Sequence, residues 1–166
     1  TFLEERFSIQ VDDEELIPEN LDSIDNVTAF NNLFVGRGLE GVKEAPGYAS
    51  DYNVFLGGAG KSAFGDARSA VSPLAPGLER TDRPRGVRLT FRLNALPTAG
   101  ERPWVDARLV GVMPTVGQTI EDRNGRPICV ETDLFGRRRD RPVAGPLADP
   151  ADGANTITWS LDRAGD

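Results

Sequence analysis

Two similar six-residue strings constrain the fold of this chain more than any other feature of its sequence. Residues 31–36 read NNLFVG and residues 52–57 read YNVFLG. When Phe34 is aligned with Phe55, the asparagine, phenylalanine and glycine positions match in identity, and the two aliphatic positions match in type. A fixed period of this size is typical of a solenoid, in which each coil buries its apolar face against the next. Chance similarity and two neighbouring strands of an ordinary sheet are the alternatives.

If two coils stack at this offset, specific side chains must meet. Phe34 is expected to lie on Phe55, and Asn32 on Asn53, where stacked asparagines can satisfy one another's amides. These four residues are therefore predicted to be structural. The segment between the strings, RGLEGVKEAPGYASD, contains glycine and proline and returns the chain to an equivalent position.

Strand patterns also occur outside the repeat. FLEERFSIQV alternates as a strand would, and Pro18 interrupts the helical tendency of EELIPENL. VRLTFRLN has period-2 apolar positions, and the segment ending in ITWSL places Ile157 and Trp159 on one face, where Trp159 suits a core. Asn124-Gly125 predicts a hairpin with a type I′ turn.

Composition excludes several functional classes. The chain has no histidine and one cysteine, so Ser-His-Asp and Cys-His triads, a conventional Cys/His zinc site and an internal disulfide cannot form within it. Cys129, between Ile128 and Val130, is predicted to be a buried strand residue. No metal-binding motif is evident: the run DDEE at 12–15 lacks the alternating spacing of a calcium loop and is expected to be a solvated turn. GGAGKS at 57–62 fails the spacing of a phosphate loop.

The charge distribution bears on partners. Of the net charge of −7, residues 1–26 carry −8, with nine acids and one arginine, and the rest of the chain carries +1. No basic stripe exists to displace counterions from phosphates, so nucleic acid is not expected as a partner. No run approaches the ~20 apolar residues of a membrane helix, so a membrane is not expected either. RRRDR at 137–141 is predicted to be a solvated turn.

Three stretches resemble a known protein family. NVTAFNNLFVG at 26–36, SDYNVFLGG at 50–58 and DLFGRRRDRPVAGPL at 133–147 are similar to the C-terminal part of right-handed parallel β-helix proteins of the pectate-lyase-like superfamily, of the secreted bacterial, polysaccharide-degrading type. In the third stretch, Asp133, Gly136 and Arg139 match a D-x-x-G-x-x-R pattern found near the end of such helices. Residues 61–120 depart from a regular coil pattern.

The resemblance implies an all-β fold, with the C-terminal coils of a right-handed parallel β-helix followed by an irregular or antiparallel extension. We expect parallel coils over 1–60, a loop-rich insertion or hairpin subdomain over 61–119, and C-terminal strands with a cap over 120–166. A full helix of this family has more coils than this chain can supply. The expected partners are therefore a polysaccharide and an N-terminal chain or fragment of the same protein.

The resemblance also implies a secreted, extracellular or periplasmic protein that binds and cleaves a polysaccharide, as a lyase or a glycoside hydrolase. No cofactor is required by the sequence, although lyases of this type use Ca²⁺ or a basic side chain to neutralise a uronate carboxylate. The signal peptide that secretion implies is not in these residues. Two alternatives stay open: a non-catalytic glycan-binding module, and a structural C-terminal cap whose catalytic residues lie upstream. A cap would expose a large apolar face without its partner.

Candidate site residues follow from this reading, each with an ordinary alternative. Lys61, Arg68 and Arg37 lie near the repeated coils and are candidates to face a uronate, or are plain surface charges. The candidates for stacking on sugar rings are aromatic residues that also suit a core: Tyr48, Tyr52 and Trp104.

Other polar residues are predicted to be structural. Asp51 is expected to cap a turn through its own backbone. Asp133 is expected to accept hydrogen bonds from turn amides or from Arg139, with Gly136 supplying an unusual φ.

Overall fold

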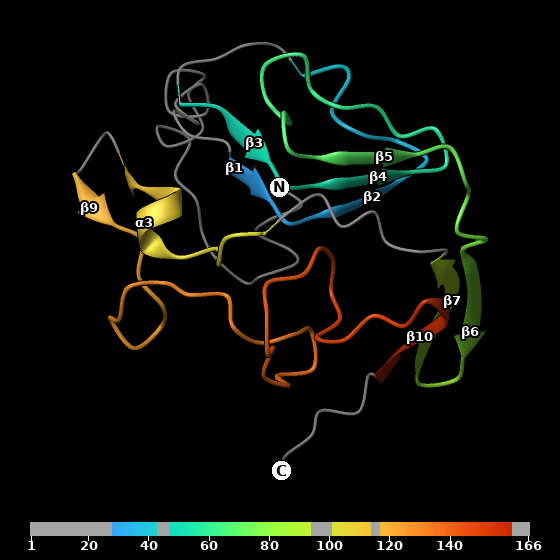
Figure 1. Cartoon of the computed structure of the whole chain (residues 1–166). Coiled ribbons are helices and arrows are strands. Elements are labelled where there is room, and N and C mark those ends of the chain that lie inside the picture. Colours follow the sequence, from blue (N-terminus) through green and yellow to red (C-terminus); the bar gives the residue numbers. More distant parts are fainter. Residues whose placement is uncertain (1–27, 43–46, 94–100, 114–116, 161–166) are drawn as a thin grey trace, which may run out of the picture.

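The computed structural model describes residues 28–42, 47–93, 101–113 and 117–160, which form short strands and one short helix (Figure 1). The strand patterns in FLEERFSIQV and EELIPENL, and the DDEE run at 12–15, lie outside the described residues. None of the helices in the described part has the length and apolar character needed to cross a bilayer.

Two parallel sheets are built from the repeated strings and the residues just before them. β1 (Thr28–Phe30) pairs with β3 (Ala49–Asp51), and β2 (Leu33–Val35) pairs with β4 (Val54–Leu56). Both pairs have the offset that the repeat predicts, and Phe34 is the direct partner of Phe55. The two strings are therefore equivalent strands of stacked coils.

Each coil turns a corner between its two strands. Asn31 separates β1 from β2 and Tyr52 separates β3 from β4, with φ values of 56° and 57°. This left-handed conformation is uncommon outside glycine, and asparagine tolerates it best among the other residues. The two corners lie at equivalent positions of successive coils, so their side chains project from the same edge of the stack.

A third strand extends the second sheet at a different spacing. β5 (Ala70–Ser72) pairs in parallel with β4, and Ala70 is the partner of Val54. The offset between the two strings does not predict β5, because the connection from β4 to β5 is shorter than the connection from β2 to β4. β5 lies within residues 61–119, the range expected to hold an insertion, and the proposed division into 1–60, 61–119 and 120–166 stays a prediction.

An antiparallel sheet follows the coils. Its order is β10 (Gly153–Ser160), β7 (Gly86–Leu93) and β6 (Glu79–Arg83), and we call it the terminal sheet. Figure 1 shows it below the coil strands, at the right of the molecule. The expected period-2 pattern is present in β7, where Phe91 and Leu93 are buried and Arg88 and Arg92 are exposed.

One apolar core joins the coils to the terminal sheet. Val54 and Leu56 of β4 pack with buried residues of the terminal sheet and of the 144–147 segment: Phe91, Leu93, Ile157, Ala144 and Leu147. On the other face of β4, Phe55 is fully buried. Because neighbouring strand residues point to opposite sides, β4 is covered on both faces, which explains its continuous run of apolar residues.

A short helix and a hairpin lie beside the coils. α3 (Ala107–Val110) begins at Asp106, whose carboxylate accepts a hydrogen bond of 2.8 Å from the Leu109 amide and so caps the helix. β8 (Val112–Met113) and β9 (Gln118–Thr119) form the antiparallel pair that follows.

Two burial predictions are wrong. Trp159 is 54% exposed, because it lies opposite Val87 at the far end of β10 and the core ends at Ile157. Cys129 is exposed and makes a single bridge with Asp106 instead of lying inside a strand.

The turn at Asn124-Gly125 also differs from its predicted type. The chain does reverse there, with an antiparallel bridge between Glu121 and Pro127. Gly125 has a φ of 72°, whereas Asn124 does not have positive φ. The carboxylate of Asp122 accepts hydrogen bonds from the Asn124 and Arg126 amides, and this local cap sets the turn in place of a type I′ geometry.

Candidate functional site at the coil corners

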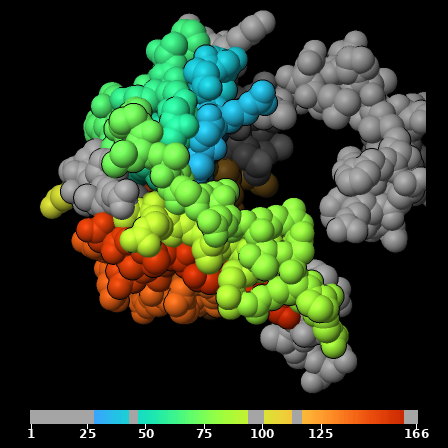
Figure 2. Space-filling model, turned by 90° about the vertical axis from the view of Figure 1, so that its right-hand side faces the viewer, coloured from blue at the N-terminus to red at the C-terminus, as the bar shows by residue number. Residues whose placement is uncertain are grey.

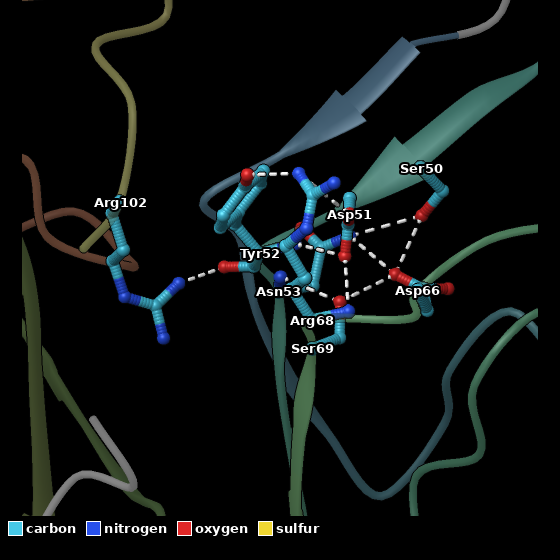
Figure 3. Close-up of polar contacts among 8 residues, drawn as sticks. All are labelled: Ser50, Asp51, Tyr52, Asn53, Asp66, Arg68, Ser69 and Arg102. Atoms are coloured by element: carbon cyan, nitrogen blue, oxygen red, sulfur yellow. Dashed lines mark hydrogen bonds and ion pairs between the residues drawn. The ribbon is translucent and has the colours of Figure 1, made fainter. Parts of the chain in front are cut away.

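The coil corners bring together two of the residues expected to contact a glycan, Tyr52 and Arg68 (Figure 3). The Arg68 guanidinium lies over the Tyr52 ring, 5.2 Å from its centroid, and donates a hydrogen bond to the Tyr52 hydroxyl. Arg68 follows Tyr52 at the same offset as β5 follows β4, so it occupies the next coil at the same corner. The side chain of Arg68 is 66% exposed, so this pair presents hydrogen-bond donors to solvent.

Asp51 stabilises the corner at Tyr52 through hydrogen bonds to backbone amides. Its Oδ1 accepts hydrogen bonds from the Tyr52 amide at 2.9 Å and from the Arg68 amide at 2.7 Å. Its Oδ2 lies 3.8 Å from the Arg68 guanidinium. The side chain is 17% exposed. Asp51 therefore caps its own turn and also ties one coil to the next.

A buried carboxylate supports the corner from inside the coil. Asp66 is fully buried and accepts hydrogen bonds from Ser50 Oγ at 2.8 Å, Asn53 Nδ2 at 2.9 Å and Ser69 Oγ at 2.7 Å. Burial acts to raise the pKa of Asp66, but the hydrogen bonds from Asn53, Ser69 and Ser50 outweigh it and hold the pKa below its ordinary value. Sequence reasoning did not find this role, because the third coil was not recognised.

Polar and aromatic ladders run through the same coils. The Asn32 amide donates to Asn53 Oδ1 at 2.8 Å, and the Asn53 amide donates to Ser69 Oγ at 2.8 Å. Asn32 Nδ2 lies 3.2 Å from Asn53 Oδ1. The rings of Phe34 and Phe55 stack with their centroids 4.9 Å apart and an interplanar angle of 8°. Each coil thus satisfies the backbone of the previous one.

Arg102 joins the two left-handed corners, and sequence reasoning missed it. Its guanidinium donates to the Tyr52 carbonyl and lies 3.4 Å from Asn31 Oδ1. Asn31 in turn donates from Nδ2 to the Pro103 carbonyl at 2.9 Å. Burial lowers the pKa of Arg102. Tyr52 and Asn31 are distant from Arg102 in sequence, so no local pattern could have revealed the contact.

Trp104 lines a pocket beside the first corner. The pocket has a volume of about 460 Å³ and lies between the first corner, at Asn31 and Asn32, and the segments around Trp104 and Pro142–Pro146. Phe30 and Arg139 also line it. Asn31 lines this pocket together with Trp104, and Arg102 contacts both Asn31 and the Tyr52 carbonyl, so Asn31 and Arg102 link Trp104 to the Tyr52–Arg68 pair. We refer to this continuous set of residues, Asn31, Tyr52, Arg68, Arg102 and Trp104, as the corner site.

The other candidates are not part of the corner site. Lys61 donates from Nζ to the Ser69 carbonyl at 3.2 Å and so supports the coil. The described contact of exposed Arg37 is a backbone hydrogen bond to Val35. The buried hydroxyl of Tyr48 has no hydrogen-bond partner among the described residues. None of these three has a described contact with Tyr52, Arg68 or Arg102.

The D-x-x-G-x-x-R stretch forms a compact turn. Asp133 accepts hydrogen bonds from the Phe135 and Arg137 amides at 2.8 and 2.9 Å and forms an ion pair with the Arg137 guanidinium at 2.7 Å. Burial acts to raise the pKa of Asp133, but the bonds from Arg137, Phe135 and Ala148 lower it to about 2. Gly136 has a φ of 77°, which allows the turn.

Arg139 does not bond to Asp133. Its guanidinium donates to the carbonyls of Thr132, Val143 and Gly145, at 3.0, 3.3 and 2.9 Å. It is 8% exposed, so RRRDR is not simply a solvated turn. The cation partner of Asp133 is therefore Arg137, whereas the sequence analysis gave Arg139 as an alternative donor.

The calcium ion implied by the family resemblance does not fit the corner site. Within the described ranges, no group of three or more acidic, histidine or cysteine side chains could hold a metal ion. Asp51 Oδ1 is already the acceptor for two amides. Ca²⁺ takes six to eight oxygen ligands, and this corner does not gather them.

Comparison with known proteins supports the fold. No family model and no curated protein matches the chain. A solved structure of XylC in complex with xylose is similar, with a TM-score of 0.60 and 18% sequence identity over 83% of this chain. The match covers 24% of XylC, so this chain spans about a quarter of the length of that protein. At this level of identity, the likeness concerns the fold alone.

Proposed function

We propose that these residues form the C-terminal coils and terminal sheet of a secreted right-handed parallel β-helix protein of the pectate-lyase-like type, and that the corner site binds a polysaccharide. The parallel pairing of successive strands, with one offset shared by the first two pairs, supports the β-helix. The fold-level likeness to XylC, whose structure contains xylose, is compatible with a carbohydrate ligand. The proposal requires further coils, supplied by an N-terminal chain or fragment.

The observation that carries this proposal is the composition of the corner site. Trp104, Asn31 and Asn32 line one pocket, and the half-buried Tyr52 with the exposed Arg68 occupies the same corner of the next two coils. Sugar recognition combines an apolar ring face with a few fixed polar groups. Arg102 and Asp51 hold both parts of the site in place. This set suits a chain of sugar units better than a compact ligand.

Binding is better supported than cleavage. A glycoside hydrolase needs two carboxyl groups that flank the bond, and a lyase needs a base with a group that neutralises a carboxylate. Asp51 lies at the corner but is engaged by two amides, and no second described carboxylate contacts Tyr52, Arg68 or Arg102. Cleavage would require residues from outside the corner site, and we propose that the further coils supply them.

A panel of soluble polysaccharides, including xylan and polygalacturonate, tests the corner site by affinity electrophoresis and calorimetry. We expect Trp104→Ala and Arg68→Gln each to weaken binding about tenfold, which corresponds to ~1.4 kcal/mol. Arg37→Gln is the matched control, because it removes the same charge from an exposed position away from the corner. The proposal fails if no polysaccharide binds the wild type, or if the control loses as much affinity as Arg68→Gln.

A structural cap is the second candidate, and exposed apolar residues favour it. Phe64, Val71, Leu74 and Leu78 are 45–55% exposed on and around β5. A cap would use this surface against another part of the protein, with catalysis located elsewhere. Both candidates predict a second polypeptide that co-elutes with the chain in light scattering and intact-mass measurements, so glycan binding by that complex distinguishes them. Binding that Trp104→Ala weakens supports the corner site, whereas a complex in which no substitution at the corner site changes glycan binding supports the cap.

A further inference from the structure

The outer face of the terminal sheet carries a set of arginines that the corner site does not use. Neighbouring residues of a strand point to opposite faces, and Phe91 and Leu93 point to the core, so Arg88, Thr90 and Arg92 point outward. The pairing register places Thr81 and Thr158 beside Arg88, and Arg83 beside Gly86. We call this surface the arginine face: Arg83, Arg88 and Arg92, with the neighbouring threonines Thr81, Thr90, Thr156 and Thr158.

The charges of the arginine face are only partly balanced by described acids. Among the described residues, no ion pair involves Arg83, Arg88 or Arg92, and the acid on the same face is Glu79, opposite Thr90. The inner face of β6 differs, because Arg80 there forms an ion pair with Asp82 at 2.7 Å. Arg80 of this hairpin is therefore compensated, whereas Arg83, Arg88 and Arg92 lack a described acidic partner.

The spacing of these arginines suits an extended anionic ligand. Arg83 and Arg88 are diagonal neighbours across two strands, which places them about 7–8 Å apart. Arg92 is on the same strand as Arg88, two outward positions further along and about 13 Å away. The side chains of Arg88 and Arg92 and all of β6 are exposed. In Figure 2 the hairpin of β6 and β7 projects from the body of the molecule, so a long chain could pass over it.

We propose that the arginine face binds an anionic polysaccharide, a glycan whose carboxylates or sulfates pair with Arg83, Arg88 and Arg92 while its hydroxyls meet the threonines. The proposal rests on the proposed function and extends it to a second surface with its own residues and a charged substrate class. A neutral glycan fits this face less well, because it carries no aromatic ring on which a sugar could stack. The lack of stacking rings also disfavours single-stranded nucleic acid.

Charge-matched variants test the arginine face. The double variant Arg88→Gln/Arg92→Gln removes two charges from it, and Arg80→Gln/Arg37→Gln removes two exposed arginine charges elsewhere. Calorimetry with polygalacturonate as the probe should show binding to wild type that weakens as salt increases, because screening grows with ionic strength. We expect the arginine-face variant to lose at least tenfold in affinity and the control to stay within about twofold. Melting temperatures of both variants should match the wild type.

Four results would overturn the proposal: no binding of polygalacturonate at low salt, equal losses in the two double variants, undiminished binding by Arg88→Gln/Arg92→Gln, or equally tight binding of duplex DNA. The last would indicate a general attraction for polyanions. Trp104→Ala separates this proposal from the corner site. If Trp104→Ala abolishes polygalacturonate binding and the arginine-face variant does not, the arginine face is not a binding surface and the corner site stands. If the reverse holds, the corner site fails for this ligand and the arginine face stands.

Discussion

The coils at 28–72 and the turns at 131–147 both depend on a buried carboxylate, but different kinds of donor group stabilise its charge. Asp66 in the coils accepts hydrogen bonds from hydroxyls, an amide side chain and the Ser62 amide. Asp133 in the turns accepts from backbone amides and from the Arg137 guanidinium, to which it is ion-paired. The coil carboxylate is thus held by neutral donors from successive segments, and the turn carboxylate mostly by groups close in sequence and one cation.

This difference shows how each region specifies its structure. In the coils, Asn53 and Ser69 occupy equivalent places in consecutive coils, so the network around Asp66 exists only when the coils stack in register. In the turns, most donors to Asp133 lie within one turn of it along the chain, so the structure is set locally. Substitutions in the coils should therefore disturb long-range pairing, and substitutions in the turns should act locally.

The largest expected effect is in the coils. Phe55→Ala removes a fully buried ring that stacks on Phe34, and we expect a loss of about 4 kcal/mol in the free energy of unfolding. Phe34→Ala should cost about half as much, because that side chain is only partly buried. Urea unfolding monitored by circular dichroism measures both. Equal losses of unfolding free energy in the two variants would contradict the larger contribution that we expect from the buried Phe55 ring.

The buried carboxylate of the coils comes next. Asp66→Ala leaves donors of Ser50, Asn53 and Ser69 without their acceptor, and we expect a loss of about 3 kcal/mol. Asp66→Asn keeps the shape and tolerates the φ of 62°, so it should cost less. Urea titration of the two variants distinguishes the acceptor role from simple packing. An Asp66→Ala variant as stable as the wild type would contradict the long-range network.

Acid should weaken the turns through Asp133. Its pKa falls from about 3.8 to about 2 on folding, so the folded state favours the ionised form. The resulting stabilisation is fully present above pH 4 and is lost as the pH falls from about 4 to about 2. Asp133→Asn should lower stability at pH 7 and flatten its dependence on pH in that window. Thermal melts from pH 7 to pH 2 provide the measurement, and an unchanged slope would count against the ion pair.

The smallest expected effect tests whether the two regions share a backbone requirement. Gly36 in the coils and Gly136 in the turns have φ values of 75° and 77°, and an added Cβ would meet nothing within 4 Å in either place. Alanine at each should cost about 1 kcal/mol through conformation alone. Thermal denaturation of both variants checks this. A cost at Gly36 several times that at Gly136 would mean that strain in a coil spreads to its neighbours.

Sequence reasoning found those parts of the fold that repeat at a constant offset. The register of β2 on β4 follows from NNLFVG and YNVFLG, since equal spacing and equal chemistry demand it. β5 was hidden, because its offset from β4 is shorter and Ser69 replaces asparagine in the ladder. Trp159 was misjudged because alternation gives the face of a residue and not the place where the core ends.

The candidate site was only partly accessible from the sequence. Tyr52, Arg68 and Trp104 were suggested by residue type, without any indication that they share a corner. Arg102 was absent from that reading, because it acts through backbone and amide groups far away in the sequence. Long-range contacts of single side chains leave no periodic trace, so only the structure reveals them.

The unequal sequence separations within the fold have a kinetic consequence. Each coil strand pairs with the next coil across one short connection, whereas β10 pairs with β7 across a much longer stretch of chain, as in the pair of Gly153 and Leu93. Closing a short loop costs less entropy and happens sooner than closing a long one. We therefore expect the coils to form early in folding and the terminal sheet to be completed last. Ile157 of β10 would then seal the core around Val54 and Leu56 in the final step.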